Sequence, residues 1–210
     1  MIATIRRRLW AFLVPCWVGV ALGQVVSAPP AGVVSSNDAL PPREGAYHGG
    51  GVHVFLDGQI AATCSSHGGF SRSVPAPARP GSTVVADYSA TFVGELTLVP
   101  PAAPRRTVHP LRAQARMTER IRLAEAQGAT RVFDTEMVTL DIRGRGLPDG
   151  VLLRESPAAR STGRTTVTTL ARDRYQIDSF YDIWLEVSLD GGRTWHRAQD
   201  RVRLSLGPIR

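Results

Sequence analysis

Lysine is absent from this 210-residue sequence, and all 25 basic residues are arginine. The absence excludes a P-loop phosphate site, Schiff-base chemistry and a lysine general base. The chain is also shorter than the roughly 250 residues of a (β/α)₈ barrel. Aromatic residues make up only 7%, whereas 20 glycines and 15 prolines favour turns over long helices. An apolar fraction of 43% is enough for one hydrophobic core.

Cysteine is nearly absent as well, with Cys16 and Cys64 as its two occurrences. Cys16 lies in an N-terminal segment that we expect to be removed, so Cys64 is alone in the mature chain. One cysteine forms no internal disulfide. We expect Cys64 to be a buried small side chain, with a free thiol as the alternative.

The N-terminal residues 1–23 are predicted to be a signal peptide. Three arginines at positions 6–8 precede an apolar run over residues 9–22, which is shorter than the roughly 20 residues of a membrane-spanning helix. Ala21 and Gly23 satisfy the small-x-small rule for cleavage after Gly23, and an uncleaved anchor is the alternative. The sequence therefore predicts a secreted or periplasmic protein.

The positive charge of the chain is weaker than its formal value suggests. The net charge of +7 falls to +4 once the signal peptide and its three arginines are removed. The remaining arginines are scattered rather than gathered into one basic patch. We therefore expect no nucleic-acid partner.

The rest of the chain has the pattern of a single all-β domain. Residues 24–46 contain four prolines and are expected to form a flexible lead-in, and residues 47–210 to form the domain. Apolar and polar residues alternate over residues 84–98, where Gly94 predicts a bend or bulge. Pro110 makes residues 107–118 a weaker strand candidate. Further strands are expected at residues 131–143, 151–155, 164–170, 174–189 and 201–206.

Many short strands with regular turn signals predict an antiparallel β-sandwich. One short helix is expected at residues 117–127, because Met117, Ile121 and Ala124 recur at helical spacing and Gly128 follows as a C-terminal cap. A strand over the same residues is the alternative.

The most specific motif is the Asp-box pattern S-x-D-x-G-x-T-W, which residues 188–195 match. Asp190 is placed to accept hydrogen bonds from turn amides and from the Thr194 hydroxyl, and Gly192 permits a positive φ. The pattern consists of Ser188, Asp190, Gly192, Thr194 and Trp195. It resembles the Asp-box of sialidases and related propellers, where the motif is a structural fold-back away from the catalytic centre.

A second resemblance rests on residues 133–140, 153–163 and 175–195. These segments are similar to the globular region of exported bacterial proteins of the PEP-CTERM-sorted and planctomycete-type groups, over roughly residues 84–206. The resemblance implies an extracytoplasmic β-domain and carries no catalytic residue or ligand with it. The C-terminal residues 207–210 lack the PEP motif and the apolar tail of that group.

The strand before the Asp-box presents a candidate ligand face. Alternation places carboxylates and aromatic rings on one side, and such a surface can stack on sugars or gather Ca²⁺ through oxygen ligands. The candidate face consists of Asp178, Phe180, Asp182, Trp184 and Glu186. A packed, purely structural role for Phe180 and Trp184 is the alternative.

Function follows less directly from the sequence than location does. We expect an exported, non-enzymatic surface, matrix or interaction module without a catalytic residue, metal site or cofactor, although Ca²⁺ is an open alternative. Its partner is unidentified, with a polysaccharide or another extracellular protein as candidates. A carbohydrate-binding module is the second hypothesis. A glycoside-hydrolase-like enzyme is the third, since Asp134 and Glu136 share one face of a predicted strand.

Overall fold

The computed structural model describes residues 32–99, 105–144, 146–171 and 173–209. The predicted signal peptide and residues 24–31 of the lead-in lie outside these ranges. The described chain consists almost entirely of strands, apart from one short 3₁₀ turn, η1 (Leu56–Gly58). The strands are β1 (Val33–Ser35), β2 (Gly45–His48), β3 (Val52–Phe55), β4 (Ile60–Gly68), β5 (Thr83–Leu98), β6 (Thr107–Gln127), β7 (Thr130–Arg143), β8 (Leu152–Glu155), β9 (Ser161–Thr169), β10 (Tyr175–Ile183), β11 (Leu185–Ser188), β12 (His196–Arg197) and β13 (Val202–Pro208).

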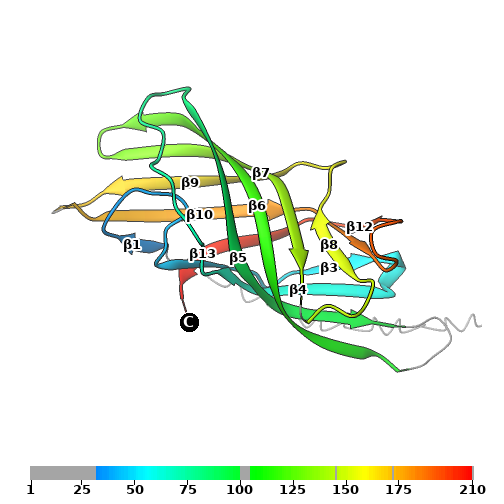
Figure 1. The fold of residues 1–210 in the computed structure, drawn as a ribbon. Helices are drawn as coiled ribbons and strands as arrows, with labels where there is room; N and C mark the ends of the chain where they lie inside the picture. The colour runs from blue at the N-terminus through cyan, green and yellow to red at the C-terminus, as the bar shows by residue number, and fades with distance from the viewer. Residues whose placement is uncertain (1–31, 100–104, 145, 172, 210) are drawn as a thin grey trace, which may run out of the picture.

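These strands close into an antiparallel barrel of eight rows (Figure 1). Strands β4, β5, β6 and β7 are one row each. The other rows consist of two successive strands with a short break between them: β2 with β3, β8 with β9, β10 with β11, and β12 with β13. The barrel closes because β9 pairs with both β7 and β10, and β13 pairs with both β10 and β2.

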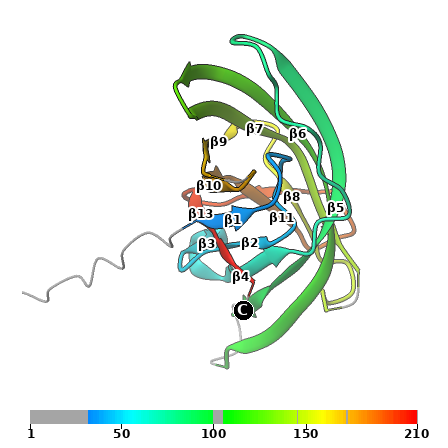
Figure 2. The same cartoon turned by 90° about the vertical axis from the view of Figure 1, so that its left-hand side faces the viewer.

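The all-β prediction is thus confirmed, and the sandwich is corrected to a barrel. Alternating burial shows that one face of each strand is covered, and this is true of a sandwich and of a closed barrel alike. Figure 2 shows how the long strands β5, β6 and β7 curve around one side of the molecule. This curvature lets a single sheet cover its own inner face.

The helix predicted for residues 117–127 is wrong, because these residues form the second half of β6. Met117 and Ile121 are four residues apart, a spacing that places two side chains on the same face of a helix and also of a strand. Backbone pairing decides between the two: β5 lies along one side of β6 and β7 along the other. Ala124 is an extra residue opposite β7, where the register shifts.

Two features that complicated the strand prediction are accommodated locally. Pro110 lies on a part of β6 that pairs with β5 alone, since pairing with β7 begins at Gln114. Gly94 lies opposite a register shift in β4, and a Cβ at this position would approach the Thr63 carbonyl oxygen to 2.0 Å. The bend or bulge predicted at Gly94 is therefore found in its pairing partner.

Two connections, residues 36–44 and 69–82, pack against the barrel interior, because Leu40, Phe70 and Val74 belong to the buried core. Leu40 and Val74 exchange two backbone hydrogen bonds of 2.9 Å. Arg131 on β7 pairs with Asp38 at 2.8 Å, which ties the first connection to the barrel wall. Part of the predicted lead-in therefore contributes to the folded structure, as β1 does by pairing with β10.

Cys64 is buried in the interior, as predicted. Burial raises the pKa of its thiol to about 12. Over the described ranges, no helix is long and apolar enough to cross a membrane.

Candidate functional site

The candidate ligand face lies on the outside of β10. Ile177, Ser179 and Tyr181 point into the barrel and are buried, so Asp178, Phe180 and Asp182 point outward. The strand ends at Ile183, and Trp184 occupies the break before β11. Every residue of β11 is buried, including Glu186. Glu186 pairs in register with Arg154 of β8 and is more buried than the other members of the predicted face.

Arg203 of β13 covers the centre of this face. Its Nε and Nη2 donate to the two carboxylate oxygens of Asp182 at 2.8 and 2.7 Å. The same guanidinium lies 4.0 Å from the centroid of the Phe180 ring. This ion pair lowers the pKa of Asp182. One face of Phe180 is thus occupied, and Asp182 has its acceptors engaged by the protein.

The remaining members of the predicted face have partners too. The Asp178 carboxylate accepts a hydrogen bond from the Gly32 amide at 3.0 Å. The Arg197 guanidinium lies 5.6 Å from the centroid of the Trp184 ring. These contacts leave fewer free carboxylate oxygens and ring faces on β10 for a sugar to bind.

Glu186 belongs to a buried network next to the Asp-box. Both Nε and Nη2 of Arg154 donate to Oε2 of Glu186, at 3.0 and 2.7 Å, and the Ser156 hydroxyl donates to Oε1 at 2.9 Å. Arg154 also stacks on Trp195, 3.9 Å from the ring centroid. The network holds β8, β11 and the end of the Asp-box hairpin together.

The Asp-box forms the turn between β11 and β12. Asp190 accepts hydrogen bonds from the amides of Arg193 and Thr194, both at 2.9 Å, and from the Thr194 hydroxyl at 2.7 Å. Ser188 donates to Asp190 at 2.8 Å and accepts from the Gly192 amide at 2.8 Å. These hydrogen bonds lower the pKa of Asp190. Both carboxylate oxygens of Asp190 therefore accept hydrogen bonds from residues of the turn itself.

Trp195 completes this turn by donating from Nε1 to the Gly192 carbonyl at 3.1 Å. Gly192 has a φ of +93°, which glycine adopts without strain. The Trp195 hydrogen bond and the Gly192 backbone conformation both lie within the motif, as its spacing predicts.

Asp134 and Glu136, the predicted carboxylate pair, point outward from β7 between arginines. Asp134 lies 3.7 Å from Arg122 and 3.5 Å from Arg164. Glu136 lies 2.5 Å from Arg120 and 3.0 Å from Arg160. These contacts place each carboxylate of β7 between an arginine of β6 and an arginine on or just before β9.

A different site on the outer face was missed at the sequence level. Arg116 points outward from β6, with Ser89 of β5 and Asp141 of β7 as its neighbours in register. Shallow hollows of about 350 and 400 Å³ adjoin it. The first is lined in part by Asp87, Ser89, Thr118, Thr139 and Asp141, and the second by Gln114, Asp141, Arg143 and Gly144.

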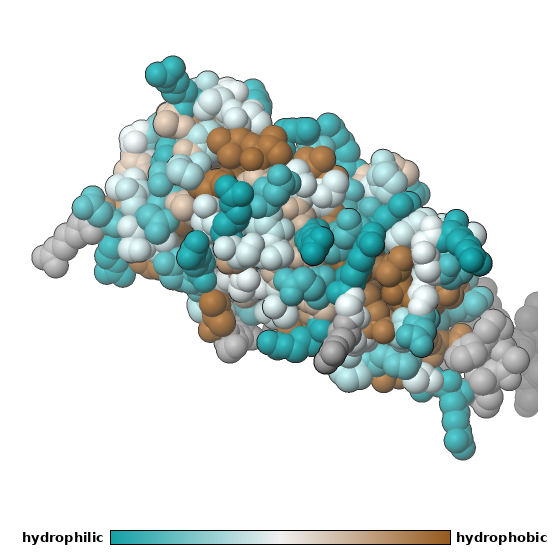
Figure 3. Space-filling model, viewed as in Figure 1, coloured by the Kyte–Doolittle hydropathy of each residue, from teal (hydrophilic) through white to brown (hydrophobic). Residues whose placement is uncertain are grey.

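Arg116 is well placed to contact a ligand. In the part of the chain that the structure describes, no ion pair engages its guanidinium, whereas Arg143 lies 3.6 Å from Asp141. Figure 3 shows this side of the molecule, where hydrophilic side chains cover most of the surface between smaller hydrophobic patches. The available signal was the recurrence of Arg112, Arg116 and Arg120 at every fourth residue, because an even spacing places all three on one face of a strand.

Glu155 is a second residue that the sequence did not single out. It is half-buried at the end of β8, and burial raises its pKa to about 7. Hydrogen bonds with Ser161 oppose that shift, while the nearby charges of Glu136 and Glu186 add to it. No local sequence pattern marks Glu155, because these neighbours come from other strands.

Within the described ranges, no group of three or more histidine, cysteine or acidic side chains is arranged to hold a metal ion. Comparison of the chain with protein-family models, curated proteins and solved structures finds no match. The resemblances drawn from the Asp-box and its flanking segments therefore stay predictions.

Proposed function

We propose that this protein is an exported, non-enzymatic interaction module that binds an acidic polysaccharide on the outer face of β6 and β7. The observation that carries the proposal is the pair of hollows beside Arg116, which together offer charged donors and oxygen acceptors on an exposed surface. The signal peptide predicted for residues 1–23 supports export.

Arginine suits the anionic groups of such a ligand. A guanidinium donates two parallel hydrogen bonds to a carboxylate or sulfate, and its charge persists at any physiological pH. Among the described residues, Arg116 forms no ion pair, and the one ion-pair contact of Arg143 is 3.6 Å long, to Asp141. Both side chains are therefore available to an anion without loss of a strong internal contact.

The neighbouring side chains suit sugar hydroxyls. Asp141 and the second carboxylate oxygen of Asp87 can accept hydrogen bonds, while Thr139 and Gln114 can donate and accept. The Thr118 hydroxyl already donates to Asp87 Oδ1 at 2.6 Å, and Gln114 Nε2 donates to the Ala90 carbonyl at 3.3 Å, so these side chains keep part of their capacity. All five lie beside the hollows. This mixture of donors and acceptors suits a chain that carries hydroxyls along with its anionic groups.

This surface is preferred over the one predicted on β10. There, Arg203 occupies one face of Phe180 and both carboxylate oxygens of Asp182. A sugar would have to displace a bidentate ion pair before it could stack on that face of the ring. Binding at Arg116 requires no such displacement.

The test is a calorimetric titration of the mature protein with polygalacturonate, with dextran as the uncharged comparison. We expect saturable binding of polygalacturonate alone, with the polymer recovered at its original length. Arg116→Gln should weaken binding about tenfold, which corresponds to about 1.4 kcal/mol.

Arg174→Gln is the matched control, because it removes the same charge from an exposed position in the turn between β9 and β10, which lies beside Thr130 at the opposite end of β7 from Asp141. Equal losses of affinity in the two variants would mean that binding depends on the net charge of the protein and not on the position of Arg116. Binding of neither polymer would overturn the proposal, and shortening of the polymer would contradict the non-enzymatic role. Export is checked by the N-terminal residue of the isolated protein, which we expect to be Gln24.

A further inference from the structure

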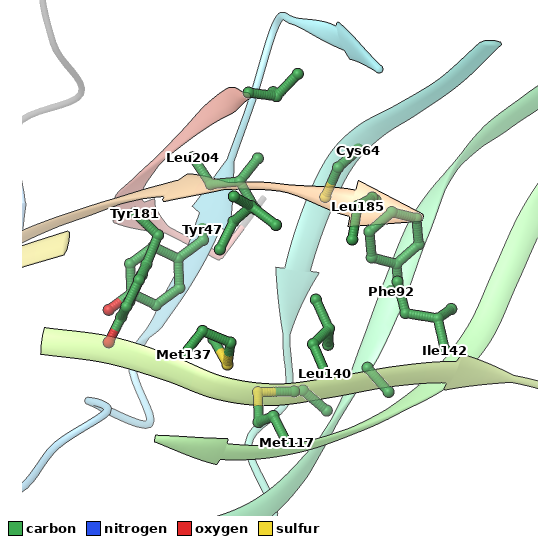
Figure 4. Close-up of a cluster of buried hydrophobic side chains, with 14 of the residues drawn as sticks. Tyr47, Cys64, Phe92, Met117, Met137, Leu140, Ile142, Tyr181, Leu185 and Leu204 are labelled. Atoms are coloured by element: carbon green, nitrogen blue, oxygen red, sulfur yellow. The ribbon is translucent and has the colours of Figure 1, made fainter. Parts of the chain in front are cut away.

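The outward side chains of β5, β6 and β7 form a regular grid around Arg116. Figure 4 shows Phe92, Met117 and Leu140, one from each of these strands, in the buried cluster of the barrel. The residues next to them in the chain therefore point outward. Neighbouring strands lie about 4.8 Å apart, and next-but-one residues of one strand lie about 6.7 Å apart. Strand register thus decides which outward side chains are neighbours.

The positions nearest to Arg116 hold one carboxylate and three neutral side chains. Across the strands, Arg116 lies in register between Ser89 on β5 and Asp141 on β7. Along β6, its outward neighbours are Gln114 and Thr118. A second cation therefore occupies none of the four nearest positions.

A second arginine lies on one diagonal from Arg116, and a second carboxylate lies on the opposite one. Arg143 is the partner of Gln114 on β7, whereas Asp87 is the partner of Thr118 on β5. A polyanion that leaves Arg116 in one direction thus reaches another arginine, and in the other direction it reaches a carboxylate. The geometry favours the path from Arg116 to Arg143.

Asp141 lies at the corner of that path. It is next to Arg116 across the strands and next to Arg143 along β7, where the contact to Arg143 is 3.6 Å. Its side chain is 48% exposed, so a bound polymer can reach it. Asp141 repels an anionic group placed over it and accepts hydrogen bonds from hydroxyls there.

A sugar ring of a polysaccharide is about as long as the spacing between neighbouring strands. A polymer on this surface therefore advances about one position of the grid with each sugar. With a carboxylate on every sugar, the sugar after the one at Arg116 would bring its charge to Asp141. With a carboxylate on every second sugar, an uncharged sugar would lie over Asp141 instead.

We propose that this surface selects acidic polysaccharides in which sugars with and without a carboxylate alternate, over polymers with a carboxylate on every sugar. The inference rests on the proposed function and specifies its ligand. Arg116 and Arg143 bind the carboxylates of alternate sugars. Asp141 accepts hydrogen bonds from the uncharged sugar between them.

General electrostatic attraction gives the opposite order of affinity. A positively charged protein binds a polyanion more tightly as the number of anionic groups rises. Repulsion by Asp141 acts against this trend, because two like charges one strand spacing apart in water change an affinity about fivefold. The order of affinity of two polymers therefore separates the two explanations.

The experiment is a calorimetric titration of the mature protein with three forms of one polymer, in buffer without divalent cations. The forms are polygalacturonate, polygalacturonate with on average every second carboxylate methyl-esterified, and the fully esterified polymer. Esterification neutralises carboxylates and leaves the sugar backbone unchanged. We expect the half-esterified form to bind about fivefold more tightly than polygalacturonate, and the fully esterified form not to bind.

The outcomes distinguish this inference from the proposed function. A steady fall in affinity as carboxylates are esterified would overturn the inference and leave the proposed function intact. Binding of neither charged form would overturn the proposed function itself.

Asp141→Asn tests the residue that is held responsible. The change removes the charge and keeps an oxygen acceptor, so polygalacturonate should bind about fivefold more tightly than it does to the wild type. The preference for the half-esterified form should then disappear. An unchanged preference in Asp141→Asn would contradict the role of Asp141.

Asp57→Asn is the matched control, because it removes the same charge from an exposed position in η1, between β3 and β4. The adjoining residue Ile60 pairs with Leu98, at the other end of β5 from Asp87. Asp57 has a φ of +52°, which asparagine also adopts readily. We expect this variant to keep the preference for the half-esterified form, and loss of the preference here would mean that net charge sets it.

Discussion

Replacing Glu186 with alanine tests whether this predicted ligand residue is instead an internal support. The change removes the acceptor for two N–H groups of Arg154 and for the Ser156 hydroxyl. The Glu186 side chain is 9% exposed and that of Arg154 is 32% exposed. Water therefore reaches the orphaned guanidinium only in part.

The expected cost follows from this partial exposure. Breaking a fully buried ion pair costs about 3–5 kcal/mol, and an exposed one about 0–1 kcal/mol. The Arg154–Glu186 pair lies between these limits, so we expect Glu186→Ala to lower the free energy of unfolding by about 2–3 kcal/mol. For a domain of this size, that loss lowers the melting temperature by about 4–12 °C.

Chemical denaturation monitored by circular dichroism measures the effect, with Asp134→Ala as the matched control. Asp134 also lies between arginines, but its side chain is 50% exposed and its contacts are 3.5 and 3.7 Å long. We expect that variant to lose at most about 1 kcal/mol. Equal losses in the two variants would refute the reasoning, because burial and short contacts would then contribute nothing. Glu186→Gln should fall between wild type and Glu186→Ala, since its amide oxygen can still accept from Ser156.

Three further outcomes follow from groups inside the barrel and in the hairpin. The Cys64 thiol, whose pKa burial raises to about 12, should not react with Ellman's reagent at pH 8 until the protein is unfolded in guanidinium; rapid reaction of the native protein would contradict its burial. Burial lowers the pKa of His53 and His67 to about 4, so both favour folding above pH 6.5 and this contribution is lost as the pH falls towards 4. A His67→Asn variant should therefore lose less free energy of unfolding between pH 6.5 and pH 4 than the wild type. An identical pH dependence in the two proteins would contradict the lowered pKa of His67. Asp190→Ala should speed amide hydrogen exchange at Arg193 and Thr194 without affecting distant strands, and unchanged exchange would mean that the turn holds without the carboxylate.

Local features of the fold could be predicted from the sequence, but the closure of the barrel could not. The expected strand over residues 131–143 matches β7 to within one residue, because alternation is a property of neighbouring side chains. Closure depends on pairing between β2 and β13, which joins residues 45–48 to residues 205–208. Alternation reports that one face of a strand is covered and is silent about which strand covers it.

The same distinction between local and distant contacts applies to the candidate site. Acceptance of turn hydrogen bonds by Asp190 follows from groups within four residues of it, so the spacing of the motif was sufficient. The cover that Arg203 places on Phe180 comes from β13, more than twenty residues further along the chain. An outward strand face therefore looks open in the sequence when a neighbouring strand supplies an arginine to fill it.

Whether residues 117–127 follow helical or strand periodicity decides where the Glu119 side chain lies. On a helix with Met117 and Ile121 in the core, Glu119 lies about 200° from Met117 and reaches solvent, where a carboxylate needs no explanation. On a strand, the odd-numbered residues share one face, and Glu119 enters the barrel between Met117 and Ile121. Interpreting these residues as a helix therefore hides the buried position of Glu119. Since spacings of four fit both periods, the residue at the intermediate position discriminates: a charged side chain flanked at ±2 by apolar ones is either a helix surface position or the polar centre of a barrel.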